Sequence, residues 1–310
     1  MEVKTFIFLG FWADYEVLCI QQACDDAYRV RQFDPSRALR EHPPLGLPRV
    51  LVKPLRGLLE RRLLREQFER HPDAIFVMLD SPLLESALRV CPTTACIHVL
   101  MRNTLRVGSR VGQAVLAARD SGCPVWSFDP DDCARHRFHP YAQFVARVAG
   151  IGGSVSTPFD LVFIGQDKGR STLLQGIQQQ AEAAGLRCHI DIRTHRKRTS
   201  RADRNIPYAD YLRLQCQGRC IIDIVKPGQA GLTLRPLEAA LYQRKLLTNS
   251  AVVRTLPFYH PDNILLFDEA RPLTPERLRR FMDAPLQPVA PEQLAAFSLP
   301  HLLRQMIRVA

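Results

Sequence analysis

A short apolar run followed by two glycines and a helix start places the strongest constraint on how this 310-residue chain folds. Ile221 to Val225 form the run, and Gly228 and Gly231 follow it. A run of this length, bounded by Pro and Gly, is typical of a buried strand in a parallel sheet. Thr233 is suited to cap a helix after the glycines, where free backbone N–H groups would collect. The segment therefore predicts a binding site for a phosphate or another anion.

Apolar strands and helices alternate along the rest of the chain as well. We expect strands at residues 5–9, 30–33, 74–79, 95–100, 124–127, 160–165, 186–192, 221–225, 245–248 and 264–267. We expect helices at residues 14–28, 55–70, 107–119, 141–148, 172–184, 208–215, 233–242 and 275–282, with loops at 34–48 and 128–140. This alternation predicts an α/β protein with parallel sheets.

A linker of small residues at 149–158 divides the chain into two halves that begin alike. Residues 160–165 repeat the apolar strand ending in glycine that is found at residues 6–10. We place the boundary in this linker, which gives an N-terminal domain at 1–150 and a C-terminal domain, with the last helices, at 151–310. Ligands of open α/β sheets bind at the carboxyl ends of the strands. The sequence thus predicts two Rossmann-like domains that face each other across a cleft.

The composition is that of a folded protein with a strong positive charge. Hydrophobic residues make up 46% of the chain, and the formal net charge is +11. Such a field favours anionic partners, namely nucleic acid, phosphorylated sugars or an anionic membrane surface. No stretch approaches the roughly 20 apolar residues that span a bilayer. The N-terminus lacks a basic region and a small-residue cleavage site, so we expect a first strand and a cytoplasmic protein.

Cysteine, histidine and aspartate residues do not form a convincing metal site. Five of the nine cysteines lie within or beside apolar runs, which is typical of free buried thiols: Cys19, Cys24, Cys96, Cys188 and Cys220. Cys133, His136 and His139 are loosely spaced and have no second ligand cluster nearby. We interpret the aspartates at 129, 131 and 132 as a capped turn and His98, inside an apolar strand, as a core histidine. We expect no metal.

The second half resembles the donor-binding domain of GT-B glycosyltransferases. The resemblance covers about half the chain, and its patches are residues 163–170, 231–240, 245–249, 258–264 and, before the linker, 127–132. The most similar members are poorly characterised glycosyltransferases of bacterial lipopolysaccharide and capsule clusters. Such a resemblance implies a nucleotide-sugar donor as co-substrate, no separate cofactor and a GT-B fold.

The resemblance assigns donor-binding residues to two strand–helix turns. Those of the first turn are Gly165, Lys168, Gly169 and Arg170; those of the second are Gly228, Gln229, Gly231, Leu232, Thr233, Arg235 and Glu238. The glycines would let the backbone approach a diphosphate, and the basic side chains would neutralise it. Glu238 is expected to contact the donor ribose. The alternatives are tight turns with solvated charges and, for Glu238, a solvated helix face.

The catalytic assignments follow from a departure from that family pattern. Many retaining members carry a second glutamate eight positions before the first, where this chain has Ala230. An inverting mechanism is therefore favoured, and it needs a general base near the acceptor hydroxyl. Asp14, after the first strand, is our first choice, although it would also suit a helix N-cap. Asp80, after the strand at 74–79, is the second choice.

The resemblance implies a glycosyltransferase, and we expect it to be cytoplasmic or, as a peripheral protein, to lie on the inner face of the plasma membrane. Its acceptor would be a glycan or glycolipid such as lipopolysaccharide core, O-antigen or capsule. An epimerase of the GT-B type is the enzyme alternative. A nucleic-acid or anion-binding protein is the non-enzyme alternative, based on the basic run at 193–204. That run contains no aromatic residues for base stacking, so nucleic acid is not the expected partner.

Overall fold

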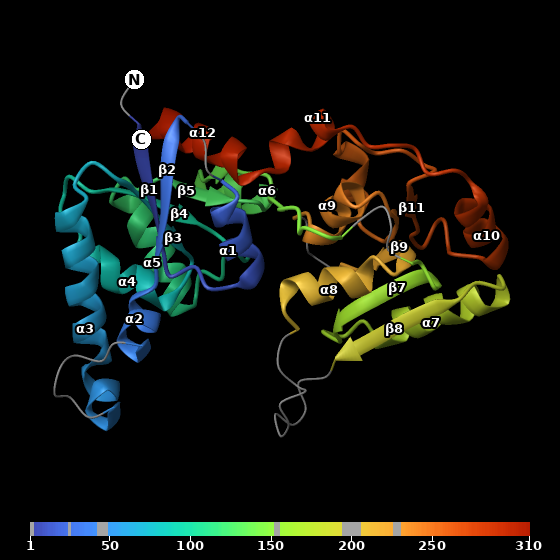
Figure 1. The fold of residues 1–310 in the computed structure, drawn as a ribbon, viewed down its shortest axis with the longest axis horizontal. Helices are drawn as coiled ribbons and strands as arrows, with labels where there is room; N and C mark the ends of the chain where they lie inside the picture. The colour runs from blue at the N-terminus through green and yellow to red at the C-terminus, as the bar shows by residue number, and fades with distance from the viewer. Residues whose placement is uncertain (1–2, 24–25, 42–48, 152–155, 194–205, 226–230) are drawn as a thin grey trace. The chain divides into compact units, whose positions relative to one another are not determined.

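The computed structural model describes residues 3–23, 26–41, 49–151, 156–193, 206–225 and 231–310. The chain forms two compact units, drawn in Figure 1. Unit 1 comprises Met1–Ala142 and Leu299–Ala310, and unit 2 comprises Gln143–Ser298. The division therefore falls before the linker at 149–158. The C-terminal helix belongs to unit 1, whereas the sequence placed it in the second domain.

Unit 1 is built on a six-stranded parallel sheet. Its strands are β1 (Lys4–Leu9), β2 (Tyr28–Phe33), β3 (Ile75–Leu79), β4 (Cys96–Leu100), β5 (Val125–Ser127) and β6 (His139–Pro140). Their order is β2-β1-β3-β4-β5-β6, and every neighbouring pair is parallel. The chain leaves β1 in one direction to reach β2 and in the other to reach β3. This reversal is a topological switch point, where open α/β sheets bind ligands.

Unit 1 contains seven helices in the described part of the chain. They are α1 (Asp14–Gln21), α2 (Pro35–Glu41), α3 (Arg49–Arg70), α4 (Pro82–Leu88), α5 (Arg110–Asp120), α6 (Pro130–His136) and α12 (Leu299–Val309). Leu64 of α3, Leu84 of α4 and Val115 of α5 are fully buried against Phe76 and Val99 of the sheet. Burying apolar side chains of this size stabilises the unit by about 1.5–3 kcal/mol each.

Unit 2 has a five-stranded parallel sheet covered on both faces. Its strands are β7 (Phe159–Gln166), β8 (Cys188–Arg193), β9 (Gly218–Asp223), β10 (Lys245–Thr248) and β11 (Ile264–Leu266), in the order β11-β10-β9-β7-β8. One face packs against α7 (Ser171–Ala183) and α10 (Pro275–Asp283). The other packs against α9 (Leu234–Leu241), and α8 (Tyr208–Gln215) also contacts β7 and β9 (Figure 1). Residues 251–255 and 295–297 form 3₁₀ turns, and α11 spans Pro291–Leu294.

Two loops and one helix expected from the sequence are wrong, and the helix expected at 14–28 ends earlier, at Gln21, with Tyr28 beginning β2. The expected loop at 34–48 contains α2, whose start is fixed by the Asp34 carboxylate accepting from the Ser36 N–H. The expected loop at 128–140 contains α6, capped by Asp129, which accepts from the N–H groups of Asp131 and Asp132. The capped turn proposed for these aspartates is therefore confirmed.

The third error concerns residues 141–148, which are extended and not helical. Phe144, Ala146 and Val148 are buried while the residues between them are more exposed, as the period of two of extended chain requires. The Val148 N–H donates to the Tyr242 hydroxyl at 2.8 Å, so the segment is held by tertiary contacts. Local sequence alone does not reveal such a partner.

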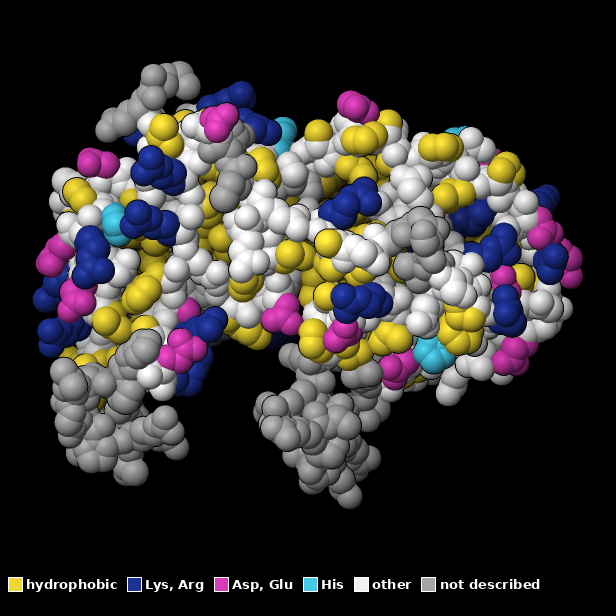
Figure 2. All heavy atoms as spheres, in the orientation of Figure 1, with side chains coloured by type: hydrophobic (Ala, Val, Ile, Leu, Met, Phe, Trp, Pro, Cys, Tyr) yellow, Lys and Arg dark blue, Asp and Glu magenta, His cyan; other side chains and the backbone are white. Residues whose placement is uncertain are grey.

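In the described part of the chain, the cysteines and the charged side chains lie as the sequence predicts. Figure 2 shows basic and acidic side chains interspersed over the face in view. Eight cysteines are free there, with Cys19 and Cys220 buried, and Cys24 lies outside that part. No helix among the described residues is long and apolar enough to cross a membrane.

His98 is a core histidine, as the sequence predicts. It lies on β4 with none of its surface exposed, and its Nδ1 accepts from the Trp126 Nε1–H at 2.9 Å. The two rings stack at 5.9 Å between centroids. Its Nε2 is buried without a hydrogen-bond partner in the described structure. Burial lowers the pKa of His98 from 6.5 to about 4, because a buried imidazolium would lose its hydration.

We predict that His98 makes unit 1 sensitive to mild acid. The unfolded state binds this proton more tightly, so stability is complete above pH 6.5 and falls by about 3 kcal/mol as the pH drops to 4. A His98→Asn variant, which keeps an acceptor near Nδ1, should show a flatter dependence of melting temperature on pH across this window. Equal pH dependence in both proteins would show that His98 does not cause it.

Candidate functional site

A buried carboxylate, Asp223, lies at the carboxyl end of β9 with none of its surface exposed. Its Oδ2 accepts from the Thr233 hydroxyl at 2.9 Å and, at 3.5 Å, from that of Thr248. Its Oδ1 lies 3.5 Å from Arg235 Nη1. Asp223 thus connects the end of one strand to the start of α9 and the end of β10. Asp223 is not among the residues predicted from the sequence, although an acid inside the apolar run 221–225 is a visible signal.

Arg235 connects Asp223 to the neighbouring strand β7. Its Nη2 donates to the Ile164 carbonyl at 2.9 Å, and its guanidinium lies 5.0 Å from the Phe163 ring centroid. A Cβ on Gly165 would lie 2.9 Å from that Nη2. Gly165 therefore makes room for Arg235, a role that differs from the close ligand approach expected from the sequence.

Arg170 holds the ends of β7 and β9 together. Its guanidinium donates to the carbonyls of Asp167, Gln166 and Ile224 at 3.3, 2.8 and 2.9 Å. It lies 5.2 Å from the same Phe163 ring that Arg235 contacts. Burial lowers the pKa of Arg170, and the positive charge of Arg235 adds to this effect. Two like charges therefore lie close together at this sheet edge.

The first strand–helix turn is shaped by Asp167, another residue that the sequence analysis did not select. Its carboxylate accepts from the backbone N–H groups of Arg170 and Ser171, at 3.1 and 3.0 Å. Hydrogen bonding to the Ser171 hydroxyl is the main reason that the pKa of Asp167 is lowered. Lys168 and Gly169 both have positive φ, 45° and 79°, and both are exposed. The turn presents the Lys168 side chain at the surface beside the start of α7.

Glu238 is buried, which rules out the alternative of a solvated helix face. It is 1% exposed, and its two carboxylate oxygens accept from the hydroxyls of Tyr208 and Tyr211 at 3.0 and 3.1 Å. Gln215 in turn donates to the Tyr211 hydroxyl at 2.8 Å. Burial raises the pKa of Glu238, and the positive charge of Arg235 opposes that rise.

The remaining predicted residues of the second turn flank the start of α9. Thr233 occupies the N-cap position of α9; its side chain accepts no capping bond, and its hydroxyl donates to Asp223. Gly231 is buried, and Leu232 packs partly against the core under α9. Gly228, Gln229 and Ala230 lie outside the described residues.

These groups form one cluster with spare hydrogen-bonding capacity for an anion. A guanidinium has five N–H donors. The described contacts use three in Arg170 and two in Arg235, and the Arg235 Nε is buried without a partner in the described structure. An anion bound here would relieve the repulsion between the two guanidiniums. We call Arg170, Asp223, Arg235 and Glu238 the unit 2 cluster.

Unit 1 has its own buried ion pair, near the carboxyl ends of β1 and β4. Glu16 is 2% exposed and accepts two bonds from Arg102, at 2.7 and 2.6 Å. The Tyr15 hydroxyl donates to Glu16 as well, and the Arg102 guanidinium lies 5.3 Å from the Trp12 ring centroid. Neither Glu16 nor Arg102 was selected from the sequence, which gives no sign that residues this far apart meet.

The two candidate bases occupy different surroundings. Asp14 is the exposed first residue of α1, and Ala13 holds the N-cap position, so the N-cap alternative for Asp14 is wrong. Asp80 accepts from the N–H groups of Arg102 and Asn103 at 2.8 and 3.2 Å and from the Asn103 side chain at 3.3 Å. Asp80 thus fixes the loop after β4, while Asp14 remains at the surface.

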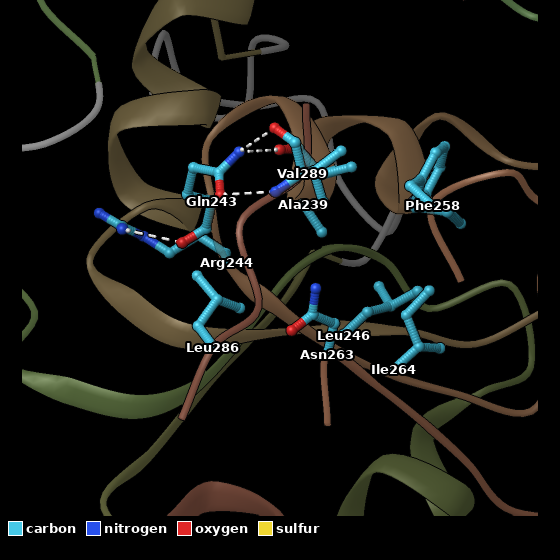
Figure 3. A pocket seen from close by; sticks show the side chains of 11 residues that line it. Ala239, Gln243, Arg244, Leu246, Phe258, Asn263, Ile264, Leu286 and Val289 are labelled. Carbon is cyan, nitrogen blue, oxygen red and sulfur yellow. Dashed lines mark hydrogen bonds between the residues drawn. The ribbon is translucent and has the colours of Figure 1, made fainter. Parts of the chain in front are cut away.

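Two cavities differ greatly in capacity. A hollow of about 1060 Å³ lies within unit 1, and its lining includes Gly10, Trp12, Phe33 and Ser81 at the ends of β1, β2 and β3. Charged side chains of α2 and α3 also line it, among them Arg37, Arg40, Glu41, Arg56 and Glu60. Figure 3 shows the second cavity, beside Gln243 in unit 2. Its volume is about 10 Å³, which holds no more than a water molecule.

The described residues contain no group of three or more metal-ligating side chains. Cys133 does not lie free in a loop but at the centre of α6, where its thiol contacts the Ser127 carbonyl at 3.4 Å. His136 ends the same helix, and its ring lies 5.5 Å from that of Phe138. These residues therefore have packing roles in unit 1.

Comparison with known proteins identifies the fold. No protein-family model and no curated protein matches the sequence. Among solved structures, UDP-GlcNAc 2-epimerase from Methanocaldococcus jannaschii is 10% identical, with 99% of each chain covered and a TM-score of 0.53. MnaA of S. aureus, in a co-structure with UDP, is 6% identical over 98% of this chain and 95% of that one, with a TM-score of 0.50.

The lipopolysaccharide outer core galactosyltransferase WaaB is 8% identical over 98% of both chains, with a TM-score of 0.49. Identities this low show a shared fold and nothing more. The likeness extends over both units, and each unit has the parallel sheet that the sequence predicts. This chain has the GT-B fold.

Proposed function

We propose that the protein is a glycosyltransferase that takes a sugar from a nucleotide-sugar donor bound by unit 2. The unit 2 cluster carries this proposal. Two guanidiniums, a helix start and the exposed Lys168 lie at the carboxyl ends of β7 and β9, where α/β sheets bind ligands. A nucleoside diphosphate would accept hydrogen bonds from the guanidinium donors that the described contacts leave unused. The UDP in the MnaA co-structure supports a uridine nucleotide as the first candidate.

In this proposal, the acceptor substrate binds to unit 1. Its hollow lies at the switch point between β1 and β3 and exceeds the usual volume of a small-ligand pocket, so it has room for several sugar rings. Its arginines are mostly paired with acids, as in Arg37 with Glu41 and Arg56 with Glu60, both at 2.8 Å. Such pairs offer donors and acceptors together, which suits sugar hydroxyls. A bacterial surface glycan is the proposed acceptor, met at the inner face of the membrane.

An epimerase acting on a nucleotide sugar is the second candidate, and the likeness in fold to UDP-GlcNAc 2-epimerase favours it. Product analysis separates the two activities. An epimerase converts UDP-GlcNAc to a different UDP-sugar without an acceptor, whereas a transferase leaves the sugar unchanged until an acceptor is added. The nucleic-acid alternative rests on residues 193–204, nearly all of which lie outside the described residues.

We predict that calorimetry will detect binding of a nucleotide among UDP, GDP, CMP and ADP and their sugars. Lys168→Ala should weaken this binding about tenfold, because it removes one charge-assisted contact to the diphosphate. Glu238→Ala should also weaken it. Arg279→Ala, which removes an exposed basic residue of α10 in the same unit, serves as the control and should leave affinity unchanged. Failure of every nucleotide to bind would contradict the proposed function.

We predict that Asp14 and Asp80 will separate by their effects on turnover and stability. Asp14→Asn should lower transfer 100-fold or more, on the order of a lost general base, with a smaller change in melting temperature than Asp80→Asn. Asp80→Asn should lower the melting temperature, because the amide NH₂ group would face N–H donors of the loop after β4 that now bond to a carboxylate oxygen. A buried donor left without an acceptor costs about 1–3 kcal/mol of stability. Asp73→Asn, at an exposed position, is the control. Full turnover in Asp14→Asn would transfer the base assignment to Asp80.

A further inference from the structure

Trp12 is the most exposed large hydrophobic side chain in the described part of the chain, with 63% of its surface accessible. It follows β1 and lines the hollow of unit 1. Its exposure forgoes the free energy that burial of so large a ring would gain. Single exposed hydrophobic residues are common on protein surfaces, so a function for Trp12 needs evidence that its position is fixed.

Contacts with β2 hold the backbone beside Trp12. The Gly10 N–H donates to the Phe33 carbonyl at 3.0 Å, and the Gln32 side chain donates to the Phe11 carbonyl. Phe11, the residue before Trp12, is 1% exposed. An anchored backbone therefore presents the exposed indole, and no ligand is needed to order the segment that carries it.

The buried ion pair of unit 1 holds the indole ring from one side. The Arg102 guanidinium lies 5.3 Å from the ring centroid, and Glu16 accepts two bonds from that guanidinium. A planar side chain with a cation over one face and 63% of its surface accessible exposes most of its other face. Among the described residues, Trp12 belongs to the lining of the hollow and Arg102 does not, which indicates that the exposed face is turned to the hollow.

The surroundings of this ring favour a sugar as its partner. The hollow measures about 1060 Å³, and hydroxyl, amide and paired charged groups line it beside Trp12. One of them is Ser81, at the N-cap of α4, whose side chain makes no capping bond. A pyranose has a face of C–H groups and an edge of hydroxyls, so it matches an aromatic face bordered by polar groups. A lipid surface would instead favour several apolar side chains together with unpaired basic residues.

We propose that Trp12 determines acceptor specificity, because a hexopyranose ring of the acceptor stacks its C–H face on the indole. This inference rests on the proposed function, since it assigns part of the acceptor to the hollow. It adds a rule for which acceptors fit. Rings with equatorial hydroxyls, such as a β-linked glucose, present C–H groups to the indole, whereas an axial hydroxyl on that face would lose its hydration against the ring. Arg102 and Glu16 then act as positioning residues for the indole.

Fluorescence reports on this contact directly, because the chain has two tryptophans and Trp126 is only 3% exposed. The probes are cellotriose, maltotriose and methyl β-D-galactopyranoside, with sorbitol as a polyol that has no ring. A ring stacked on Trp12 should shift its emission to shorter wavelengths and lower its quenching by iodide about twofold, since one face becomes covered. Sorbitol should change neither. No change with any of the three sugars overturns the proposal.

Substitutions show whether the indole itself supplies the affinity. In calorimetry with the sugar that gives the largest shift, Trp12→Ala should weaken binding about tenfold, and Trp12→Phe, which keeps a smaller aromatic face, should weaken it less. Leu58→Ala is the matched control, because Leu58 of α3 is 59% exposed and lies outside the lining of the hollow. Equal affinity in Trp12→Ala and the wild-type protein would contradict stacking on the indole.

Two comparisons separate this inference from a membrane contact and from the proposed function. A shift of Trp12 emission with vesicles of phosphatidylglycerol and phosphatidylcholine, and not with sugars, makes Trp12 a membrane contact and overturns the proposal. Nucleotide binding and sugar transfer in a protein whose Trp12 does not respond to sugars overturn this inference alone. Sugar binding at Trp12 in a protein that binds no nucleotide overturns the proposed transfer alone.

Discussion

The contact between Asp223 and Arg235 is the interaction on which the rest of unit 2 depends. A carboxylate with no exposed surface needs hydrogen-bond donors inside the protein, and Thr233 and Arg235 supply them from the start of α9. That requirement fixes where α9 begins relative to β9. Arg235 then extends to the Ile164 carbonyl, which joins the same cluster to β7. One buried charge thereby aligns two strand ends and a helix.

The geometry around this contact explains several residues at once. Gly165 lacks a side chain where the Arg235 guanidinium lies, and Phe163 presents its ring to both Arg235 and Arg170. The guanidiniums retain unused donors, although their positions are set by backbone carbonyls and not by a ligand. A site prepared in this way needs little rearrangement when an anion binds, which lowers the cost of binding. Glu238 differs, because each of its two oxygens already accepts a hydrogen bond from a tyrosine hydroxyl, of Tyr208 or Tyr211.

Unit 1 repeats this arrangement with different residues. Glu16 is buried and is held by two bonds from Arg102, and Asp80 receives the backbone N–H groups that follow β4. Both acids lie beside the carboxyl ends of the sheet; Glu16 is buried and Asp80 is partly buried. Asp14, two residues before Glu16, is exposed at the start of the same helix. In both units, carboxylates that accept hydrogen bonds from neighbouring elements shape the loops at the carboxyl ends of the strands.

The sequence by itself determined the fold class, the order of nearly every strand and helix, and the two turns of unit 2, because periodicity and glycine positions are local properties. It also identified Arg170, Arg235 and Glu238, but it did not give their partners. Asp223, Tyr208, Tyr211 and the Glu16–Arg102 pair were decided only by the tertiary structure, since each depends on residues from separate elements meeting at a sheet edge. The extended conformation of residues 141–148 also depends on tertiary structure, because the Val148 N–H donates to the Tyr242 hydroxyl, and no local pattern indicates that contact.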